Sequence, residues 1–231
     1  MYKNKSFLAI IPARSGSKGL VNKNIKEINK IPLMAYTILN SICTNIFDDI
    51  VVSTDSEKYA QIARNYGASV PFLRPDYLAT DTATTYDLIT YTLNELEKLK
   101  KTYDYFVLLQ PTSPLRDDKD IINAVDLLID KNANAVVSVC EVNHPSYLNV
   151  NLSEDKKLDG FSNIKRRQDV KIEYKINGAI YICSMPYFFE FSDFYKENCF
   201  AFVMDKFKSI DIDDIYDFMF AQTILNLNYK L

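Results

Sequence analysis

Tryptophan is absent from this 231-residue sequence, and histidine occurs only once. That histidine, His144, precedes a proline, and the sequence has no G-x-S-x-G motif, so we interpret His144 as a loop residue and do not expect a Ser-His-Asp hydrolase. The cysteines are widely separated without C-x-x-C spacing, which argues against a Cys/His zinc site. We expect reduced core residues of a cytoplasmic protein at Cys43, Cys140, Cys183 and Cys199.

Long apolar runs are also missing. No segment approaches about eighteen consecutive apolar residues and no apolar signal core precedes the first strand, so neither membrane spanning nor secretion is expected. Glycine is scarce, with five in the chain, and two of them, Gly16 and Gly19, lie in one loop. At 48% hydrophobic, the chain is long enough to bury a core as a single domain over residues 1–231.

Positive charge is concentrated near the N-terminus, although the net charge of the chain is -3. Residues 1–30 contain seven Lys or Arg and one acid, which favours a small anionic partner over a nucleic acid. Glycines in the loop at 14–24 let backbone N–H groups approach an anion, and Arg14, Lys18 and Lys23 offset its charge. The loop is not a Walker P-loop, because Lys18 is followed by glycine. An ordinary Ser/Gly turn with surface lysines also fits.

Apolar strands alternate with amphipathic helices, which predicts an α/β fold with a mainly parallel, doubly wound sheet. Strands are expected at 7–11, 49–53, 105–109, 177–183 and 199–204, and a last strand is expected to end at 209–214. Helices are expected at 32–42, 54–66, 81–101, 117–129 and up to 227, with Asp81 and Asp117 as N-caps of the third and fourth.

Three polar segments follow strands of this sheet, at 14–24, 53–55 and 110–116. Each alone could be a turn, but their convergence on the edge formed by the carboxyl ends of the strands favours a ligand site. The alternation of strands and helices is interrupted at 145–175. We interpret this segment as a dimerisation arm or a lid, although its seven Lys/Arg and five Asp/Glu also suit a solvated loop.

Asp211 and Asp213 are two residues apart in an expected extended segment, which points both carboxylates to one side. Two oxygen ligands on one face suit Mg²⁺. Alternatively, Asp213 or Asp214 only caps the last helix. The residues alone leave this choice open.

Six motifs together resemble the CMP-sialic acid synthetases, a family of cytidylyltransferases, and they occur in that family's order. Residues 12–24 fit P-A-R-x-x-S-K-G-x-x-x-K-N; the other segments are VSTD at 52–55 with LRP at 73–75 and LATDTATT at 78–85, LLQPTSPLR at 108–116, NGAIYI at 177–182, and SIDID at 209–213. The resemblance covers nearly the whole chain. It implies transfer of CMP from CTP to the C2 hydroxyl of a nine-carbon 2-keto sugar acid such as N-acetylneuraminate or legionaminate, with Mg²⁺ as cofactor and a homodimer as the assembly.

The resemblance also implies a role for particular residues. The nucleotide would be bound by Arg14, Ser17, Lys18, Lys23, Asn24, Arg74, Ala83 and Thr85. The sugar would be bound by Gln110, Arg167, Lys175 and Asn177, and Mg²⁺ by Asp211 and Asp213. The catalytic roles would belong to Arg14, Lys18 and Asp211.

The sequence departs from the family near the expected sugar site. Residues 166–171 keep Arg167 and Gln168 but lack the prolines of the family's P-R-Q-x-L-P, and Lys175 stands where arginine is common. A lysine offers a point charge where arginine offers a bidentate fork. The alternatives are a cytidylyltransferase for 3-deoxy-manno-octulosonate or pseudaminate, a glycosyltransferase with a metal-binding Asp-x-Asp, and an inactive nucleotide-binding module.

Overall fold

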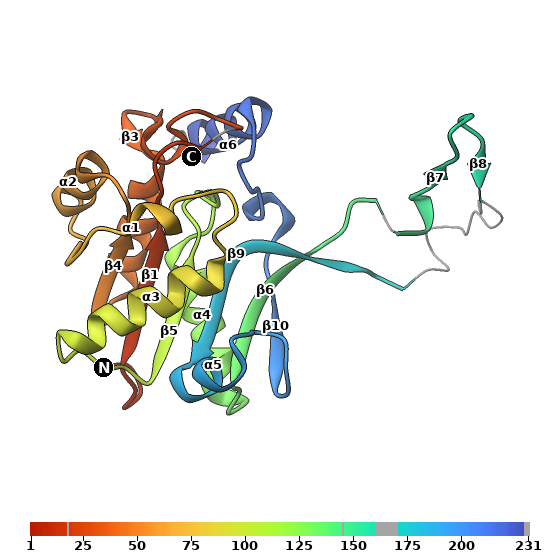
Figure 1. The fold of residues 1–231 in the computed structure, drawn as a ribbon. Coiled ribbons are helices and arrows are strands. Elements are labelled where there is room, and N and C mark those ends of the chain that lie inside the picture. The colour runs from red at the N-terminus through yellow and green to blue at the C-terminus, as the bar shows by residue number, and fades with distance from the viewer. Residues whose placement is uncertain (18, 145, 160–170, 229–231) are drawn as a thin grey trace.

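A computed structural model describes residues 1–17, 19–144, 146–159 and 171–228 (Figure 1). The main sheet contains β1 (Phe7–Pro12), β4 (Asp49–Ser53), β5 (Tyr105–Leu109), β6 (Ala135–Glu141), β9 (Tyr174–Ser184) and β10 (Cys199–Val203). The helices are α1 (Leu33–Thr44), α2 (Glu57–Asn65), α3 (Thr85–Lys98), α4 (Asp118–Asp130), α5 (Met185–Phe191) and α6 (Ile215–Asn228). Two small hairpins pair β2 (Glu27–Ile28) with β3 (Ile31–Pro32), and β7 (Asn151–Leu152) with β8 (Leu158–Asp159).

The six strands are ordered β10-β6-β9-β5-β1-β4, and β9 alone among them runs antiparallel to its neighbours. The sheet is therefore mixed and mainly parallel, as the alternation of strands and helices predicts. Because five strands share one direction, their carboxyl ends meet at one edge, the upper edge in Figure 1, where α6 and the β2–β3 hairpin also lie.

Both faces of the sheet are covered, and the central strands β1 and β5 are apolar at every position. Phe7, Ala9 and Ile11 of β1 pack with α1, α2 and α4, whereas Leu8 and Ile10 pack with α3 and α5 on the opposite face. This alternation follows the two-residue period of a strand. A third cluster packs α6 against the β2–β3 hairpin and the start of α1, and so fixes the chain that follows residue 209 to the ligand edge.

The structure corrects several sequence-based expectations. The third helix begins at Thr85 rather than Asp81, because Thr84 and Asp87 form a reciprocal capping box. Residues 209–214 join no sheet, and β6 and α5 are elements that the sequence analysis does not identify. Cys43 is exposed on α1 rather than in the core. The N-cap Asp117, the strands at 49–53 and 105–109, and the loop position of His144 are confirmed.

Between β6 and β9 the chain leaves the body, and the β7–β8 hairpin lies at the far end of this projection (Figure 1). Where the chain returns from the projection into β9, it carries exposed apolar side chains, including Ile172, Tyr174 and Ile176. Within the part of the chain that the structure describes, no helix has the length and apolar character needed to cross a membrane.

Candidate active site

The loop after β1 is held in place by the ends of neighbouring elements. Asp55, just after β4, accepts hydrogen bonds from the backbone N–H (2.8 Å) and the hydroxyl of Ser15. Burial raises the pKa of Asp55, but these hydrogen bonds outweigh it and the net pKa lies below the ordinary value. Further along, Asn24 is buried and its Nδ2 donates to the Arg14 carbonyl at 3.0 Å. Asn24 therefore folds the loop back on itself.

Gly19 lets this loop approach the segment that precedes α6. A Cβ at Gly19 would lie 2.6 Å from the carbonyl oxygen of Asp213, which is closer than side chains tolerate. Nearby, Lys23 Nζ lies 2.5 Å from the Ile212 carbonyl and 3.4 Å from Asp213 Oδ1. The cationic loop and the acidic segment, which are far apart in the sequence, thus meet at the ligand edge.

Arg14, the first residue of the loop at 14–24, contacts the segment that precedes α3. Its Nη2 lies 2.7 Å from Asp81 Oδ1, and its Nη1 donates to the Ala79 carbonyl at 3.1 Å. Asp81, expected as a helix cap, therefore orients an arginine instead. The reason is that the Thr-Asp-Thr-Ala-Thr-Thr stretch offers several capping side chains, and Thr84 is the one adjacent to the first helical turn.

A first cavity of about 470 Å³ opens beside this loop. Among the residues that line it are Arg14, Ser17, Lys23, Asn24, Arg74, Ala83 and Thr85. These are the residues expected to bind nucleotide, apart from Lys18, which lies outside the described residues. The structure therefore brings together groups from the loop after β1, the end of β5 and the segment between α2 and α3.

Arg74 forms the inner wall of this cavity. It is 5% exposed, and its guanidinium donates to the carbonyls of Ser53 (2.6 Å) and Leu78 (3.2 Å). Burial lowers its pKa to about 10, while Asp55 opposes the shift. Nε has no partner among the described residues. Arg74 thus places a positive charge in a fixed position, and its Nε–H remains an unpaired hydrogen-bond donor.

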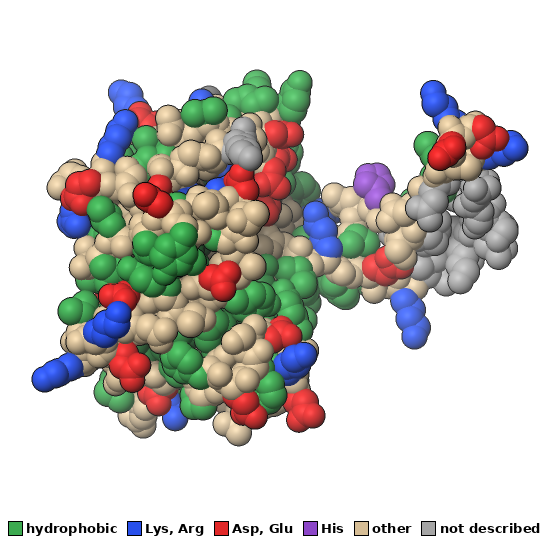
Figure 2. Space-filling model, viewed as in Figure 1, with side chains coloured by type: hydrophobic (Ala, Val, Ile, Leu, Met, Phe, Trp, Pro, Cys, Tyr) green, Lys and Arg blue, Asp and Glu red, His purple; other side chains and the backbone are tan. Residues whose placement is uncertain are grey.

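A second cavity, also about 470 Å³, adjoins the first. Gln110, Lys175, Asn177, Asp211 and Asp213 are among its lining residues. Gln110 and Asp213 line both cavities, so the two spaces meet at these side chains. Arg167, the remaining expected sugar-binding residue, lies outside the described residues. Figure 2 shows acidic side chains gathered at the upper end of the body, on the side from which the projection leaves.

A bulge in β9 shapes the wall of the second cavity. The register between β6 and β9 shifts between Val137 and Val139, and Gly178 has a φ of +76°. Asn177 is buried there: its Oδ1 accepts from Ser138 Oγ at 2.6 Å, and its Nδ2 donates to Ser209 Oγ at 2.9 Å. The Asn177 amide is therefore used within the protein, and it builds the wall of the cavity.

The acidic segment presents two carboxylates to the second cavity. Loss of hydration raises the pKa of Asp211, and the charge of Asp213 adds to the shift, while a hydrogen bond from Thr112 and the charge of Lys23 oppose it. Asp214 caps α6 by accepting from the N–H groups of Tyr216 (2.8 Å) and Asp217 (3.0 Å). The helix cap is thus Asp214, which leaves Asp211 and Asp213 available.

These two carboxylates suit a hard cation. Gly178 lies next to the Asp211 carboxylate: a Cβ at position 178 would be 3.4 Å from Asp211 Oδ2, and the glycine leaves that space open. No group of three or more His, Cys, Asp or Glu able to hold a metal occurs within the described ranges. Mg²⁺ commonly takes one or two carboxylates and completes its shell with phosphate oxygens and water, so the donor set fits Mg²⁺ bound together with a phosphorylated substrate.

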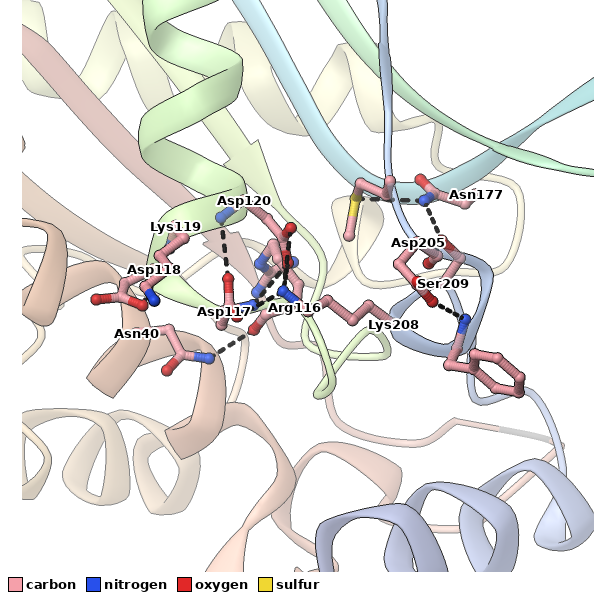
Figure 3. Close-up of polar contacts among 12 residues, drawn as sticks. Asn40, Arg116, Asp117, Asp118, Lys119, Asp120, Asn177, Asp205, Lys208 and Ser209 are labelled. Atoms are coloured by element: carbon pink, nitrogen blue, oxygen red, sulfur yellow. Dashed lines mark hydrogen bonds and ion pairs between the residues drawn. The ribbon is translucent and has the colours of Figure 1, made fainter. Parts of the chain in front are cut away.

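The sequence analysis misses two residues that support the site, Arg116 and Lys208 (Figure 3). Arg116 is fully buried, and its guanidinium donates to the carbonyls of Gln110 (3.2 Å) and Ala179 (2.7 Å) and to Thr37 Oγ1 (2.7 Å). It therefore ties the end of β5 to the β9 bulge and to α1. A single sequence shows that Arg116 ends a Pro-rich motif but gives no sign of its burial.

A family model described as Cytidylyltransferase matches residues 8–216. The N-acylneuraminate cytidylyltransferase of Escherichia coli O18:K1:H7 is 42% identical over 94% of this chain and 51% of its own length. The CMP-N,N'-diacetyllegionaminic acid synthase of Legionella pneumophila is 35% identical over 96% of this chain and 97% of its own length. The chain thus spans about half the length of the first relative and nearly all of the second.

More distant proteins share the fold. The pseudaminic acid cytidylyltransferase of Campylobacter jejuni is 30% identical over 96% of this chain and 97% of its own length. A solved structure of CMP:2-keto-3-deoxy-manno-octonic acid synthetase complexed with CTP superposes with a TM-score of 0.75, at 14% identity, over 96% of this chain and 99% of the other. At that identity the likeness shows the α/β fold alone.

Proposed function

The chain belongs to the cytidylyltransferase family, and from this premise we propose that it transfers CMP from CTP to the C2 hydroxyl of a nonulosonic acid, a nine-carbon 2-keto sugar acid. The observation that carries the proposal is the pair of adjoining cavities that share Gln110 and Asp213. One cavity has the cations that a triphosphate needs, and the other has one lysine and three carboxylates among its described lining residues. A transfer between two substrates requires such a meeting point.

The first cavity suits CTP. Arg14, Lys18 and Lys23 would hold the triphosphate, while Arg74, Ala83 and Thr85 would surround the cytosine. A triphosphate would compete with Asp81 for Arg14, and the half-exposed Arg14–Asp81 pair can be broken at little cost. The buried, fixed guanidinium of Arg74 suits a small pyrimidine, because a base that accepts a hydrogen bond from its unpaired Nε gains an interaction that other bases lack.

The second cavity suits an acidic sugar. Lys175 is the one cationic residue among the described residues that line the second cavity. Its side chain forms no ion pair with another described residue. Lys175 would attract the substrate carboxylate as a point charge, with Gln110 and Arg167 as the other expected contacts. The relatives named for N-acylneuraminate and diacetyllegionaminate are more similar to this chain than the pseudaminate relative, which favours the first two sugars.

The reaction needs no covalent enzyme intermediate. The C2 oxygen of the sugar forms a bond to the α-phosphorus of CTP as the bond to pyrophosphate breaks, and the hydroxyl proton is lost to solvent. Asp211 and Asp213 would hold Mg²⁺, which when bound supplies charge neutralisation at the phosphate oxygens. Arg14 and Lys18 would offset charge on the leaving pyrophosphate, and Gln110 would orient the sugar where the cavities meet.

We further propose that the chain is one cytidylyltransferase domain, with 145–175 as an arm that reaches a second copy in a homodimer. Support comes from Leu152 and Ile172, which are 61% and 62% exposed on the projection. Such side chains would be sheltered against a twofold-related copy. A mixed dimer of Arg167→Ala and Lys18→Ala subunits should regain part of the activity by forming one intact shared site. A monomer in light scattering, or a mixed dimer as inactive as its parents, would contradict this proposal.

Pyrophosphate release tests the proposed function. We expect release from CTP and Mg²⁺ only when a nonulosonic acid is present. A glycosyltransferase would not release pyrophosphate from CTP and sugar acid, and an inactive nucleotide-binding module would show no turnover. Either result would overturn the proposal.

A further inference from the structure

The segment that carries Asp211 and Asp213 is held by contacts on both sides of Asp211. Ser209 to Asp213 belongs to no helix or strand. On the C-terminal side, the Ile212 N–H donates to the Thr112 carbonyl at 2.9 Å, the Ile212 carbonyl accepts from Lys23 Nζ, and the Ile212 side chain is buried in the third cluster. The N–H groups of residues 210 and 211 make no backbone hydrogen bond within the described chain. Asp211 itself accepts a hydrogen bond from Thr112, so the remaining support of its backbone comes from the N-terminal end of the segment.

The N-terminal end of this segment is held by Lys208, the last residue of a short 3-10 helix, η5 (Lys206–Lys208). Lys208 Nζ lies 2.5 Å from Asp117 Oδ2 and 3.2 Å from Asp120 Oδ2 (Figure 3). Asp117 and Asp120 are the two members of the capping box that begins α4, so both are fixed by backbone hydrogen bonds. We name these three residues the Lys208 clamp.

A second set of contacts orients the chain just after the clamp. Ser209 Oγ donates to the Asp205 carbonyl at 2.7 Å and accepts from Asn177 Nδ2 at 2.9 Å. Asn177 lies in the β9 bulge that borders Asp211. The segment is thus fastened to α4 and β9 at one end and to Thr112 at the other, with Asp211 between the fastenings.

From this geometry we infer that Lys208 is a positioning residue for the metal-binding pair: its ion pairs with Asp117 and Asp120 hold Asp211 and Asp213 where they can bind Mg²⁺ together. The inference rests on the proposed function, because it takes the two carboxylates as the metal ligands. Groups that orient metal ligands affect metal affinity even though they do not touch the metal. Lys208 and Asp117 are more than a third exposed, so the ion pair between them contributes little to overall stability, whereas the side chain of Asp120 is 11% exposed.

Mn²⁺ binding to the nucleotide-free enzyme, measured by the loss of the free-Mn²⁺ EPR signal, separates positioning from stability. Lys208→Met should raise the Mn²⁺ Kd by about tenfold, as is usual for residues that orient metal ligands. Asp117→Asn keeps a good N-cap but removes the charge, so it should act in the same direction by less, because Asp120 remains. Lys208→Arg should stay within about twofold of the wild type. All of these variants should keep the wild-type melting temperature within a few degrees.

The matched control is Lys101→Met, which removes a similarly exposed ion pair, 2.8 Å from Asp49, at the opposite edge of the sheet. It should leave Mn²⁺ binding unchanged. A wild-type Mn²⁺ Kd in folded Lys208→Met would overturn the clamp alone. If instead Asp211→Asn binds Mn²⁺ as the wild type does, both the metal assignment and the clamp are wrong.

Discussion

Substitution of Arg116 by methionine should destabilise the protein by about 2 to 4 kcal/mol, because it removes a fully buried guanidinium that satisfies three acceptors. Methionine is unbranched and apolar, so it fills much of the same space. The carbonyls of Gln110 and Ala179 would lose a charged donor, at a cost of about 1 to 3 kcal/mol each. Burial lowers the Arg116 pKa to about 10, so the group is charged at neutral pH. Removing that buried charge offsets part of the loss.

Urea unfolding followed by far-UV circular dichroism measures this change, since the chain has no tryptophan for fluorescence. The control is Arg64→Met, which removes an arginine that is 39% exposed and paired with Glu57, and it should cost less than about 1 kcal/mol. If Arg116→Met costs no more than Arg64→Met, the reasoning about the buried guanidinium is refuted. An equal loss with Arg116→Lys would show that the fork of donors, rather than charge alone, matters.

Three further predictions concern the metal, the loop and the nucleotide. Asp211→Asn or Asp213→Asn should lower turnover by on the order of a hundredfold or more with an unchanged circular dichroism spectrum, and near-normal activity in EDTA would contradict this. The pKa of Asp55 is lowered in the folded protein, so the stability that its hydrogen bonds with Ser15 contribute is complete above its ordinary pKa of about 3.9 and is lost as pH falls through the lower folded value. The difference in free energy of unfolding between wild type and Asp55→Asn should therefore shrink only in strong acid. A difference that shrinks near neutral pH would count against this role of Asp55. CTP should be used far better than ATP or GTP because of Arg74, and equal rates would refute that role.

Local patterns predict the elements whose ends are set by neighbouring residues. The cap at Asp117 could be read from the sequence, because Asp120 completes a capping box three residues later. The strand at 105–109 is apolar throughout and short, as buried parallel strands are. The six motifs also predict residues that line each cavity, apart from those outside the described ranges.

Other features depend on contacts between residues that are distant in the sequence, and local patterns do not predict them. Residues 209–213 alternate like a strand, but they pair with no strand among the described residues and lie outside the sheet. Asp81 could cap a helix by its type, yet Arg14, distant in the sequence, determines its role. The importance of Arg116 and Lys208 comes entirely from long-range contacts, which neither periodicity nor turn chemistry reveals.

The identity of the product decides whether the chain transfers CMP to a nonulosonic acid. Incubation with CTP, Mg²⁺ and a panel of nonulosonic acids, followed by ³¹P NMR, should show the α-phosphorus of CTP moving into a phosphodiester with the sugar as free pyrophosphate appears. We expect this with N-acetylneuraminate or a legionaminate derivative, and not when the sugar acid is omitted. A CTP spectrum that stays unchanged across the whole panel, or a product that forms only with 3-deoxy-manno-octulosonate, would contradict the proposed function.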